Sequence, residues 1–395
     1  MISLLFWACL LIVAAVYFGY PMALAAGALG RRKSHICGDS YPFVSVIIAA
    51  HNEEACIEAK IQNVLASDYP REKIEILIGS DGSSDGTEEI VRRYERDGVG
   101  LLSFPQQHGK SAIQNGLVAV SNGSVLVFTD ADCFTPPETL RRVLSHFTDS
   151  NVGLVTARPQ YSNLTETRIS ENEGAYLRYE TWLRRQESER GLLAMASGSF
   201  FALRRSLWRP LDPALGDDFA LPLRVALAGL RNILDPSVVA VTHLSQSQPR
   251  SMLRLKTRII SKDLRALLVH RAILNPLRFG SVAASLWFHK LLRWLVPYFL
   301  LAALAANSFL ANHAPYRALL AAQLAFYALA LAGLALRGRA LPSLLSLPTS
   351  FCLVNFAALA GTLKCLLGRK SGQWHPDRRA STSIPSLHRA SHDAD

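Results

Sequence analysis

Apolar residues dominate both ends of the chain, whereas the central region alternates short apolar runs with polar stretches. Residues 2–30 carry no charged side chain and exceed the roughly 20 apolar residues that a helix needs to cross a bilayer. No small-residue cleavage site follows a short apolar core, so we expect residues 1–30 to form a retained transmembrane helix. The basic residues Arg31, Arg32 and Lys33 come next and predict that this end of the helix faces the cytoplasm.

The region from residue 41 to residue 248 has the pattern of an α/β domain, which we expect to be cytoplasmic. Its apolar runs predict buried strands, and the segments that follow several of them predict helices with acidic first turns, as the helix dipole favours. The expected strands are Phe43–Ala50, Ile74–Gly79, Val125–Phe128 and Ala196–Leu203, and a helix is expected over Ala220–Leu230.

Residues 249–294 predict amphipathic helices at the membrane interface. Four basic residues are spaced three or four apart and share one helix face, and Leu255, Ile259 and Leu267 line another. These basic residues are Arg254, Arg258, Lys262 and Arg265. The segment Trp287–Trp294 mixes aromatic and basic side chains, which is typical of interfacial anchors, and we interpret His289 as one of these anchors.

Residues 295–367 predict a C-terminal membrane region. Two spans are expected, over residues 295–310 and 317–336, joined by an uncharged turn. Pro342, Pro348, Asn355 and Lys364 interrupt the last apolar segment, residues 341–367, and a full span there would place the basic tail outside the cell. We therefore predict a re-entrant or interfacial hairpin for this segment, followed by a disordered basic tail over residues 371–395.

Charge and cysteine content exclude several classes of protein. The net charge of +11 comes from basic residues that flank apolar segments, and no basic patch interleaved with aromatics predicts binding of nucleic acid. The six cysteines include no C-x-x-C pair, which argues against a zinc site and against a disulfide framework. We interpret Cys133 as a packing residue rather than a nucleophile.

Acidic side chains follow two of the predicted strands. Asp130 and Asp132 end the run Val125–Thr129, where open parallel sheets bind their ligands, and carboxylates there suit Mg²⁺ bound to a diphosphate. A surface turn is the alternative. Asp81 begins a Gly/Ser-rich loop, and its carboxylate can accept a hydrogen bond from a base N–H or a ribose hydroxyl. An ordinary capped turn also fits this pattern. The glycine spacing of this loop is not that of a dinucleotide-binding enzyme.

Two further motifs carry candidate chemistry. Lys110 follows Gly109 at a predicted helix start, which places an ammonium beside free backbone N–H groups and suits phosphate; a solvated lysine is the alternative. Asp217 and Asp218 follow Gly216 at another helix start, where they either cap the helix or supply a general base for an acceptor hydroxyl.

Together these motifs resemble the family 2 glycosyltransferases, which are inverting enzymes with a GT-A fold. The similarity is to the membrane branch related to cellulose, hyaluronan and poly-N-acetylglucosamine synthases. It covers about residues 41–270, in the family's order, and implies a Rossmann-like mixed sheet flanked by helices. The motifs are Val44–Glu54, Asp81–Thr87, Gly109-Lys110-Ser111, Asp130-Ala131-Asp132, Ala196-Ser197-Gly198 and Gly216-Asp217-Asp218.

The resemblance implies a role for each matched residue. Asp132, together with Asp130, would bind Mg²⁺ or Mn²⁺, and Asp218 would be the general base with Asp217 beside it. The residues expected to bind the nucleotide-sugar donor are Ala49, His51, Glu53, Asp81, Lys110, Asp130, Ser197, Gly198, Arg254 and Arg258. The helix that carries Arg254 and Arg258 can be interpreted in two ways. Its basic face either covers the diphosphate of the donor or binds anionic lipid at the membrane interface.

One departure from the family concerns processivity. The polymerising synthases carry Gln-x-x-Arg-Trp before their membrane helices, and this chain has Ile259 where the Trp is expected. Single-sugar addition is therefore an alternative to polymerisation.

The resemblance implies a multi-pass inner-membrane enzyme with a cytoplasmic catalytic domain. We expect it to transfer a sugar from a nucleotide-diphospho-sugar, for which UDP is the expected nucleotide, to a polysaccharide or lipid-linked saccharide. Membrane lipids and an oligomeric or secretion partner are the expected associations. Two alternatives stay open, transfer to a polyprenyl phosphate and a non-catalytic nucleotide-sugar sensor, although intact Asp132 and Asp218 argue against the sensor.

Overall fold

A computed structural model describes residues 1–161, 168–242, 249–336 and 343–368. The chain divides into two compact units. The sheet unit contains residues 32–163 and 188–245, and the helical unit contains residues 1–31, 164–187 and 246–371. The tail predicted to be disordered lies outside the described residues.

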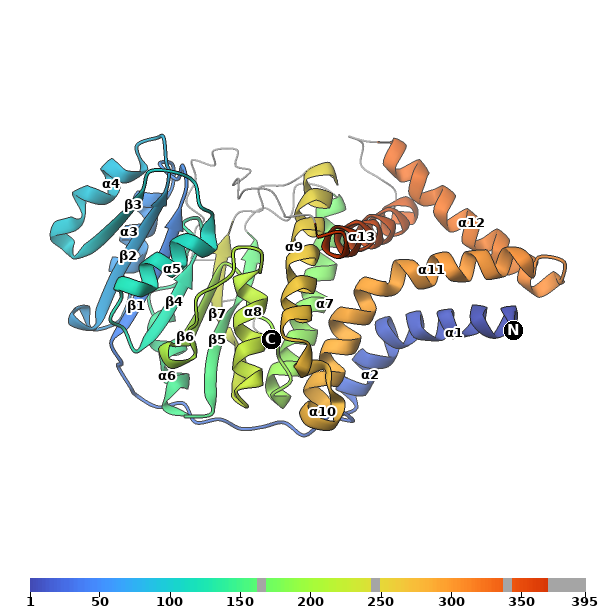
Figure 1. Cartoon of the computed structure of the whole chain (residues 1–395), viewed down its shortest axis with the longest axis horizontal. Coiled ribbons are helices and arrows are strands. Elements are labelled where there is room, and N and C mark those ends of the chain that lie inside the picture. The colour runs from blue at the N-terminus through green and yellow to red at the C-terminus, as the bar shows by residue number, and fades with distance from the viewer. Residues whose placement is uncertain (162–167, 243–248, 337–342, 369–395) are drawn as a thin grey trace. The chain divides into compact units, whose positions relative to one another are not determined.

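The sheet unit is built on seven strands in the order β3-β2-β1-β4-β6-β5-β7 (Figure 1). Strands β3, β2, β1 and β4 are parallel neighbours, β6 is antiparallel to both β4 and β5, and β7 is parallel to β5. The strands are β1 (Val44–Ala50), β2 (Ile74–Asp81), β3 (Val99–Phe104), β4 (Val125–Thr129), β5 (Val152–Tyr161), β6 (Phe200–Arg204) and β7 (Arg231–Thr242). This mixed sheet agrees with the predicted α/β class.

Burial explains why the central strands read as unbroken apolar runs in the sequence. Every residue of β1 and β4 is buried, because helices cover both faces of a central parallel sheet. Helix α5 packs on β1 and β2, and α6 and α8 pack on β5 and β7. The helices of this unit are α3 (Ile57–Leu65), α4 (Thr87–Arg93), α5 (Lys110–Val120), α6 (Thr139–Ser145) and α8 (Asp217–Leu227), with short helical turns η2 (Arg71–Lys73), η3 (Glu95–Asp97), η4 (His146–Thr148) and η5 (Arg205–Leu207).

One predicted strand begins later than its apolar pattern indicates. We expected a strand from Ala196, but β6 begins at Phe200, because Ser197 and Phe200 pair across a tight turn. The small residues before Phe200 therefore form a turn rather than a strand.

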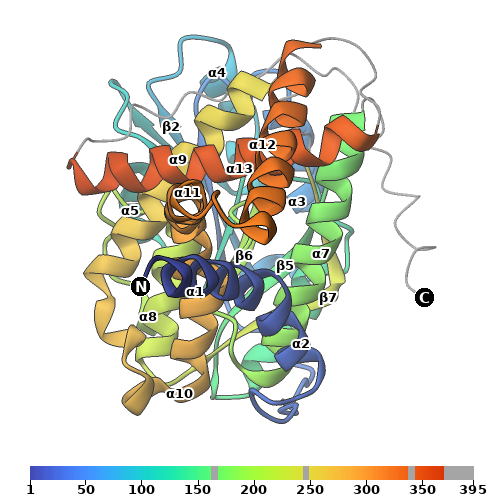
Figure 2. The same ribbon diagram turned by 90° about the vertical axis from the view of Figure 1, so that its right-hand side faces the viewer.

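The helical unit contains the two apolar ends of the chain. Helix α1 packs along α11, and α13 crosses α9 and also packs on α12 (Figure 2). The helices are α1 (Ile2–Ala14), α2 (Tyr20–Ala25), α7 (Arg168–Arg190, whose last three residues belong to the sheet unit), α9 (Pro249–Val269), α10 (Pro276–Ser285), α11 (Leu292–Phe309), α12 (Ala314–Ala335) and α13 (Ser343–Leu366), with π-helical turns η1 (Ala15–Gly19) and η7 (Leu286–Leu291) and the 3₁₀ turn η6 (Arg271–Leu274).

Four helical stretches among the described residues are long and apolar enough to cross a membrane. They are Ile2–Ala25, Pro276–Phe309, Ala314–Ala335 and Leu344–Leu366. The second begins well before residue 295, where a span is expected, because helical structure runs from α10, which is kinked at Gly280 (φ 48°), through the π-helical turn η7 into α11. It therefore includes residues that we had assigned to interfacial helices.

The last of these stretches corrects the predicted hairpin. Residues 343–366 form the single helix α13 instead of two segments with a turn between them. Polar side chains in the segment bond to carbonyls of their own helix: Thr349 Oγ1 donates to Leu345 O (2.7 Å) and Asn355 Nδ2 to Phe351 O (2.9 Å). Such bonds let an apolar helix tolerate Pro348 and Asn355, which the sequence pattern had indicated as breaks.

His289 differs from the interfacial anchor that the sequence predicted. It is buried on η7, with Nδ1 2.7 Å from Glu187 Oε1 and Nε2 3.0 Å from Glu180 Oε1. Both ring nitrogens therefore face carboxylate oxygens of α7. The hydroxyl of Tyr20 on α2 also donates to Glu187 (2.6 Å), so this polar cluster ties α2 and η7 to α7.

Candidate active site

Asp81 holds the loop that precedes α5. Its buried carboxylate accepts the backbone N–H of His108 (2.6 Å) and of Gly109 (2.9 Å). Gly109 has a φ of 89°, a conformation that favours glycine, and Lys110 then begins α5. The carboxylate at the end of β2 thereby fixes the position of the backbone from which the Lys110 side chain extends.

Lys110 connects the acidic groups of two other elements. Its ammonium lies 2.8 Å from Asp130 Oδ1 and 3.4 Å from Asp217 Oδ2, and it donates to the Gly198 carbonyl at 3.1 Å. Burial lowers the pKa of this amine, but the charges of Asp130 and Asp217 outweigh burial and raise it. The strand ends and the start of α8, predicted separately from the sequence, therefore meet around one lysine.

The two acids at the start of α8 lie in different surroundings. Asp217 is buried and accepts from Gln114 Nε2 (2.7 Å). Burial alone would raise the pKa of Asp217, but the positive charge of Lys110 and the bond from Gln114 lower it. Asp218 is partly exposed and packs beside Gly198, where an added Cβ would lie 3.1 Å from Asp218 Oδ2. Asp217 is therefore held as an ion, whereas Asp218 is the more exposed of the two.

Asp130 and Asp132 lie at the end of β4, as predicted. The backbone N–H of Asp130 donates to the Ser199 carbonyl (3.1 Å), which attaches this loop to the turn before β6. Burial and the neighbouring charge of Asp130 raise the pKa of Asp132 to about 6. Two partly buried carboxylates at one strand end form a set of hard oxygen donors, which is the chemistry that Mg²⁺ and Mn²⁺ prefer.

Lys60 on α3 is a candidate site residue that the sequence analysis missed. Its side chain is buried beneath the loop after β4, where the ammonium donates to Thr129 Oγ1 (2.9 Å) and to the Cys133 carbonyl (2.5 Å). The sequence does carry a signal for it, because residues 57, 60, 61 and 64 share the buried face of α3. Cys133 is fully buried, and burial raises the pKa of its thiol to about 11, which agrees with a packing role.

The remaining donor-binding candidates of the sheet unit lie along β1 and in the turn before β6. Ala49 is a buried residue of β1, and His51 Nδ1, just beyond it, donates to the Asp81 carbonyl (2.6 Å). Glu53 is buried, and its backbone N–H donates to Thr87 Oγ1 (2.8 Å). The backbone N–H of Ser197 donates to Thr156 Oγ1 (2.8 Å).

Residues 45–210 match the family model Glycosyl transferase family 2. The chain carries a family 2 glycosyltransferase domain. The matched region holds the acids of β2 and β4 and the Lys110 helix start, and it ends shortly before α8.

Similarity to known proteins agrees with this family 2 domain. The chain is 33% identical over 145 residues to glycosyltransferase AglE of Haloferax volcanii, which covers 33% of this chain and 48% of that protein. It is 28% identical over 216 residues to the beta-monoglucosyldiacylglycerol synthase of Trichormus variabilis, a match that covers 51% of this chain and 46% of that protein. It is 24% identical over 231 residues to the poly-beta-1,6-N-acetyl-D-glucosamine synthase of Staphylococcus aureus, a match that covers 57% of this chain and 55% of that protein. The chain spans about half the length of these relatives.

A solved structure confirms the predicted GT-A-like fold. A mannosyltransferase from Pyrobaculum calidifontis, in complex with GDP-Man and Mn²⁺, superposes with a TM-score of 0.69 at 24% identity. The match covers 93% of this chain and 100% of that one.

Two of the predicted donor-binding residues belong to the helical unit. Arg254 and Arg258 lie on α9, which is a single helix as expected, whereas the acids and Lys110 belong to the sheet unit. Arg254 is exposed and Arg258 is partly buried.

Proposed function

We propose that this protein is a membrane-bound inverting glycosyltransferase. It transfers a sugar from a nucleoside diphospho-sugar to a lipid-linked or polysaccharide acceptor, with its catalytic domain in the cytoplasm and its apolar helices in the inner membrane. The family 2 domain and the four candidate spans support this combination of catalysis and membrane attachment.

The observation that carries the proposal is the meeting of acids at Lys110. Asp130 from the end of β4 and Asp217 from the start of α8 both pair with this ammonium, and Asp81 from the end of β2 holds the loop that begins its helix. Groups from three elements at the carboxyl edge of a sheet form the kind of site that binds a nucleotide in open α/β folds.

In the proposed reaction, the acceptor hydroxyl oxygen attacks the anomeric carbon as the bond from that carbon to the diphosphate oxygen breaks. Asp218 takes the proton of the hydroxyl, and the nucleoside diphosphate leaves with the electron pair of the broken bond. Lys110 lies where its charge stabilises that leaving group, and attack from the opposite side inverts the anomeric centre.

Asp132, with Asp130, would hold Mg²⁺ or Mn²⁺, which when bound neutralises charge that develops on the diphosphate. The raised pKa of Asp132 supports this assignment, because a bound cation offsets the repulsion between the two carboxylates. Binding of the diphosphate by Arg254 and Arg258 stays a prediction from the sequence.

The names of two relatives support the proposed acceptor class. One is a beta-monoglucosyldiacylglycerol synthase and the other a poly-beta-1,6-N-acetyl-D-glucosamine synthase, so related domains serve both a lipid and a polysaccharide.

The test is sugar transfer by the full chain in detergent, with labelled UDP- and GDP-sugars, Mg²⁺ or Mn²⁺, and lipid extract as acceptor. We expect the wild type to release nucleoside diphosphate and to label a lipid or polymer. Asp218→Asn should bind the donor as well as wild type does and lose transfer. The matched control is Asp212→Asn, because Asp212 is an exposed acid in the loop before α8. Transfer at the wild-type rate by Asp218→Asn would refute the base assignment, and a lipid monophosphosugar product would identify a polyprenyl phosphate acceptor.

A further inference from the structure

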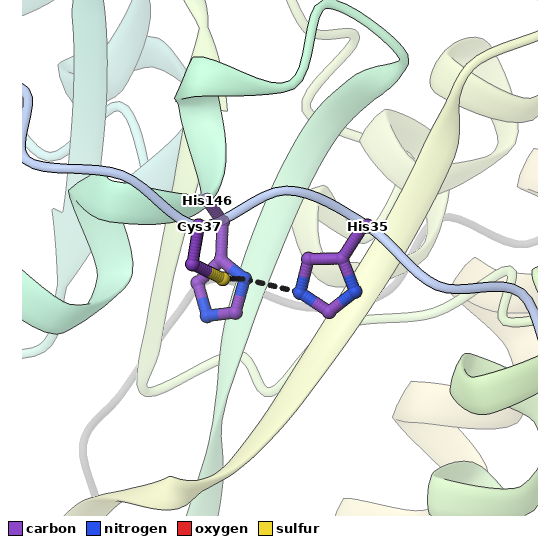
Figure 3. Close-up of side chains that lie close together, drawn as sticks. All are labelled: His35, Cys37 and His146. Carbon is purple, nitrogen blue, oxygen red and sulfur yellow. Dashed lines mark hydrogen bonds between the residues drawn. The ribbon is translucent and has the colours of Figure 1, made fainter.

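A second cluster of metal-ligating side chains lies outside the candidate active site. His35 and Cys37 belong to the segment between the first apolar helix and β1, and His146 begins the turn η4 directly after α6 (Figure 3). His35 Nε2 is 2.7 Å and Cys37 Sγ is 3.3 Å from His146 Nδ1. The three potential ligand atoms all lie within 4.8 Å of one another.

From this geometry we infer that His35, Cys37 and His146 bind a borderline transition-metal ion, for which Zn²⁺ is the expected occupant. One thiolate and two imidazoles favour Zn²⁺ over Mg²⁺ or Mn²⁺, which prefer oxygen ligands. A tetrahedral zinc ion holds two imidazole nitrogens about 3.3 Å apart and a nitrogen and a sulfur about 3.6 Å apart. The two spacings to His146 Nδ1 therefore need to open by less than about 1 Å to admit the ion, and the His35–Cys37 pair, within 4.8 Å, needs to close by about 1 Å.

The surroundings of His146 supply an independent observation. Its Nε2 lies 2.9 Å from Asp235 Oδ2, and the other oxygen of Asp235 accepts from the Ser237 backbone N–H (2.9 Å) and hydroxyl (2.7 Å). A neutral imidazole that donates from Nε2 to a carboxylate keeps a lone pair on Nδ1, which points at His35 and Cys37. A carboxylate behind a ligating histidine is the usual arrangement that orients a zinc ligand.

The position of the site suggests what the ion does. Residues 32–43 have no regular secondary structure and join the first apolar helix to β1. They are already attached by bonds from Lys33 N to Glu189 O (2.7 Å) and from Gly38 N to Ser145 O (3.3 Å). A metal ion would add three coordinate bonds and fix this connection to the sheet unit. Cys37 is exposed, so a fourth position is open to water.

Co²⁺ is the probe that separates this site from the aspartates, because only a thiolate ligand gives a sulfur-to-cobalt charge-transfer absorption. The full chain, stripped of metal and held in excess Mg²⁺ to occupy the oxygen-ligand site, is titrated with Co²⁺. We expect one equivalent to produce the charge-transfer band, and Zn²⁺ to abolish it by displacement. Asp235→Asn should keep the band and weaken the affinity about 10- to 100-fold.

Cys37→Ser is the decisive variant, since Cys37 is exposed and we expect its replacement to leave the fold intact. It should lose the band and also the increase in melting temperature that Zn²⁺ gives the wild type. Cys56→Ser is the matched control, because Cys56 is the cysteine near the candidate aspartate site: burial, and then the charge of Asp132, raise the pKa of its thiol. The absence of any band in the wild type would overturn the inference. So would a band that survives Cys37→Ser and disappears in Cys56→Ser.

Discussion

Replacing Lys110 by methionine tests whether one lysine holds the acidic site together. The substitution keeps a side chain of similar length and removes only the ammonium that pairs with Asp130 at 2.8 Å and Asp217 at 3.4 Å. Asp217 would then be a buried carboxylate, and within the described part of the chain Gln114 is the side chain that still donates to it.

The structure sets the size of the expected effect. Breaking a buried ion pair costs about 3–5 kcal/mol, because a charge is left buried without its partner. The side chains here are 21%, 30% and 12% exposed for Lys110, Asp130 and Asp217, so water compensates part of the loss. We therefore expect the free energy of unfolding to fall by about 2–3 kcal/mol without metal. Saturating Mn²⁺ should narrow this difference in the free energy of unfolding, since the cation supplies positive charge to Asp130, one of the two carboxylates that lose the ammonium.

Urea denaturation followed by tryptophan fluorescence measures the loss in free energy of unfolding without metal. Repeating it with saturating Mn²⁺ measures how far the ion narrows that loss. Trp208 stacks on Phe128 of β4 with ring centroids 5.2 Å apart, so its emission reports on the sheet unit. Lys73→Met is the control, because Lys73 is exposed and its ammonium donates to a backbone carbonyl, that of Tyr41, with no carboxylate paired to it in the described residues. The reasoning is wrong if Lys110→Met unfolds at the wild-type urea concentration both with and without the ion.

Three further predictions concern the same site. Gly198→Ala should reduce turnover about tenfold with little change in donor binding, because its Cβ would push the Asp218 carboxylate by a few tenths of an ångström. A steady-state comparison of kcat and KM measures this effect. Lys60→Met should lower the free energy of unfolding by about 2–4 kcal/mol, since two buried oxygens lose their donor, and Lys73→Met should not. Chelation by EDTA should abolish transfer, and added Mn²⁺ or Mg²⁺ should restore it, whereas restoration by Zn²⁺ alone would contradict a site of hard oxygen ligands.

The sequence predicted the parts of the site that depend on strand ends. Asp81 and Asp130 each follow an apolar run, and the carboxyl ends of parallel strands meet at one edge of the sheet, so their proximity to the Lys110 helix start could be inferred. The pairing of Lys110 with Asp217 could not, because β6 runs antiparallel between β4 and β5 and brings α8 to that edge through topology that local patterns do not encode.

Two other features show where local patterns fail. Cys37 and His146 are 109 positions apart in the chain, so no short spacing motif signals a metal site, and a search for C-x-x-C pairs pointed away from one. In α13 the polar residues indicated breaks, but Thr349 and Asn355 bond to backbone carbonyls of their own helix, which side-chain polarity alone does not reveal.

The most direct test of the central claim is the position of Mn²⁺ in crystals of the full chain grown with a nucleoside diphosphate. The account predicts an anomalous peak about 2.1–2.2 Å from an oxygen of Asp132, bridging to the diphosphate, with Lys110 near the same phosphates. A diphosphate bound elsewhere on the molecule, or a peak with no contact to Asp132 or Asp130, would contradict the account.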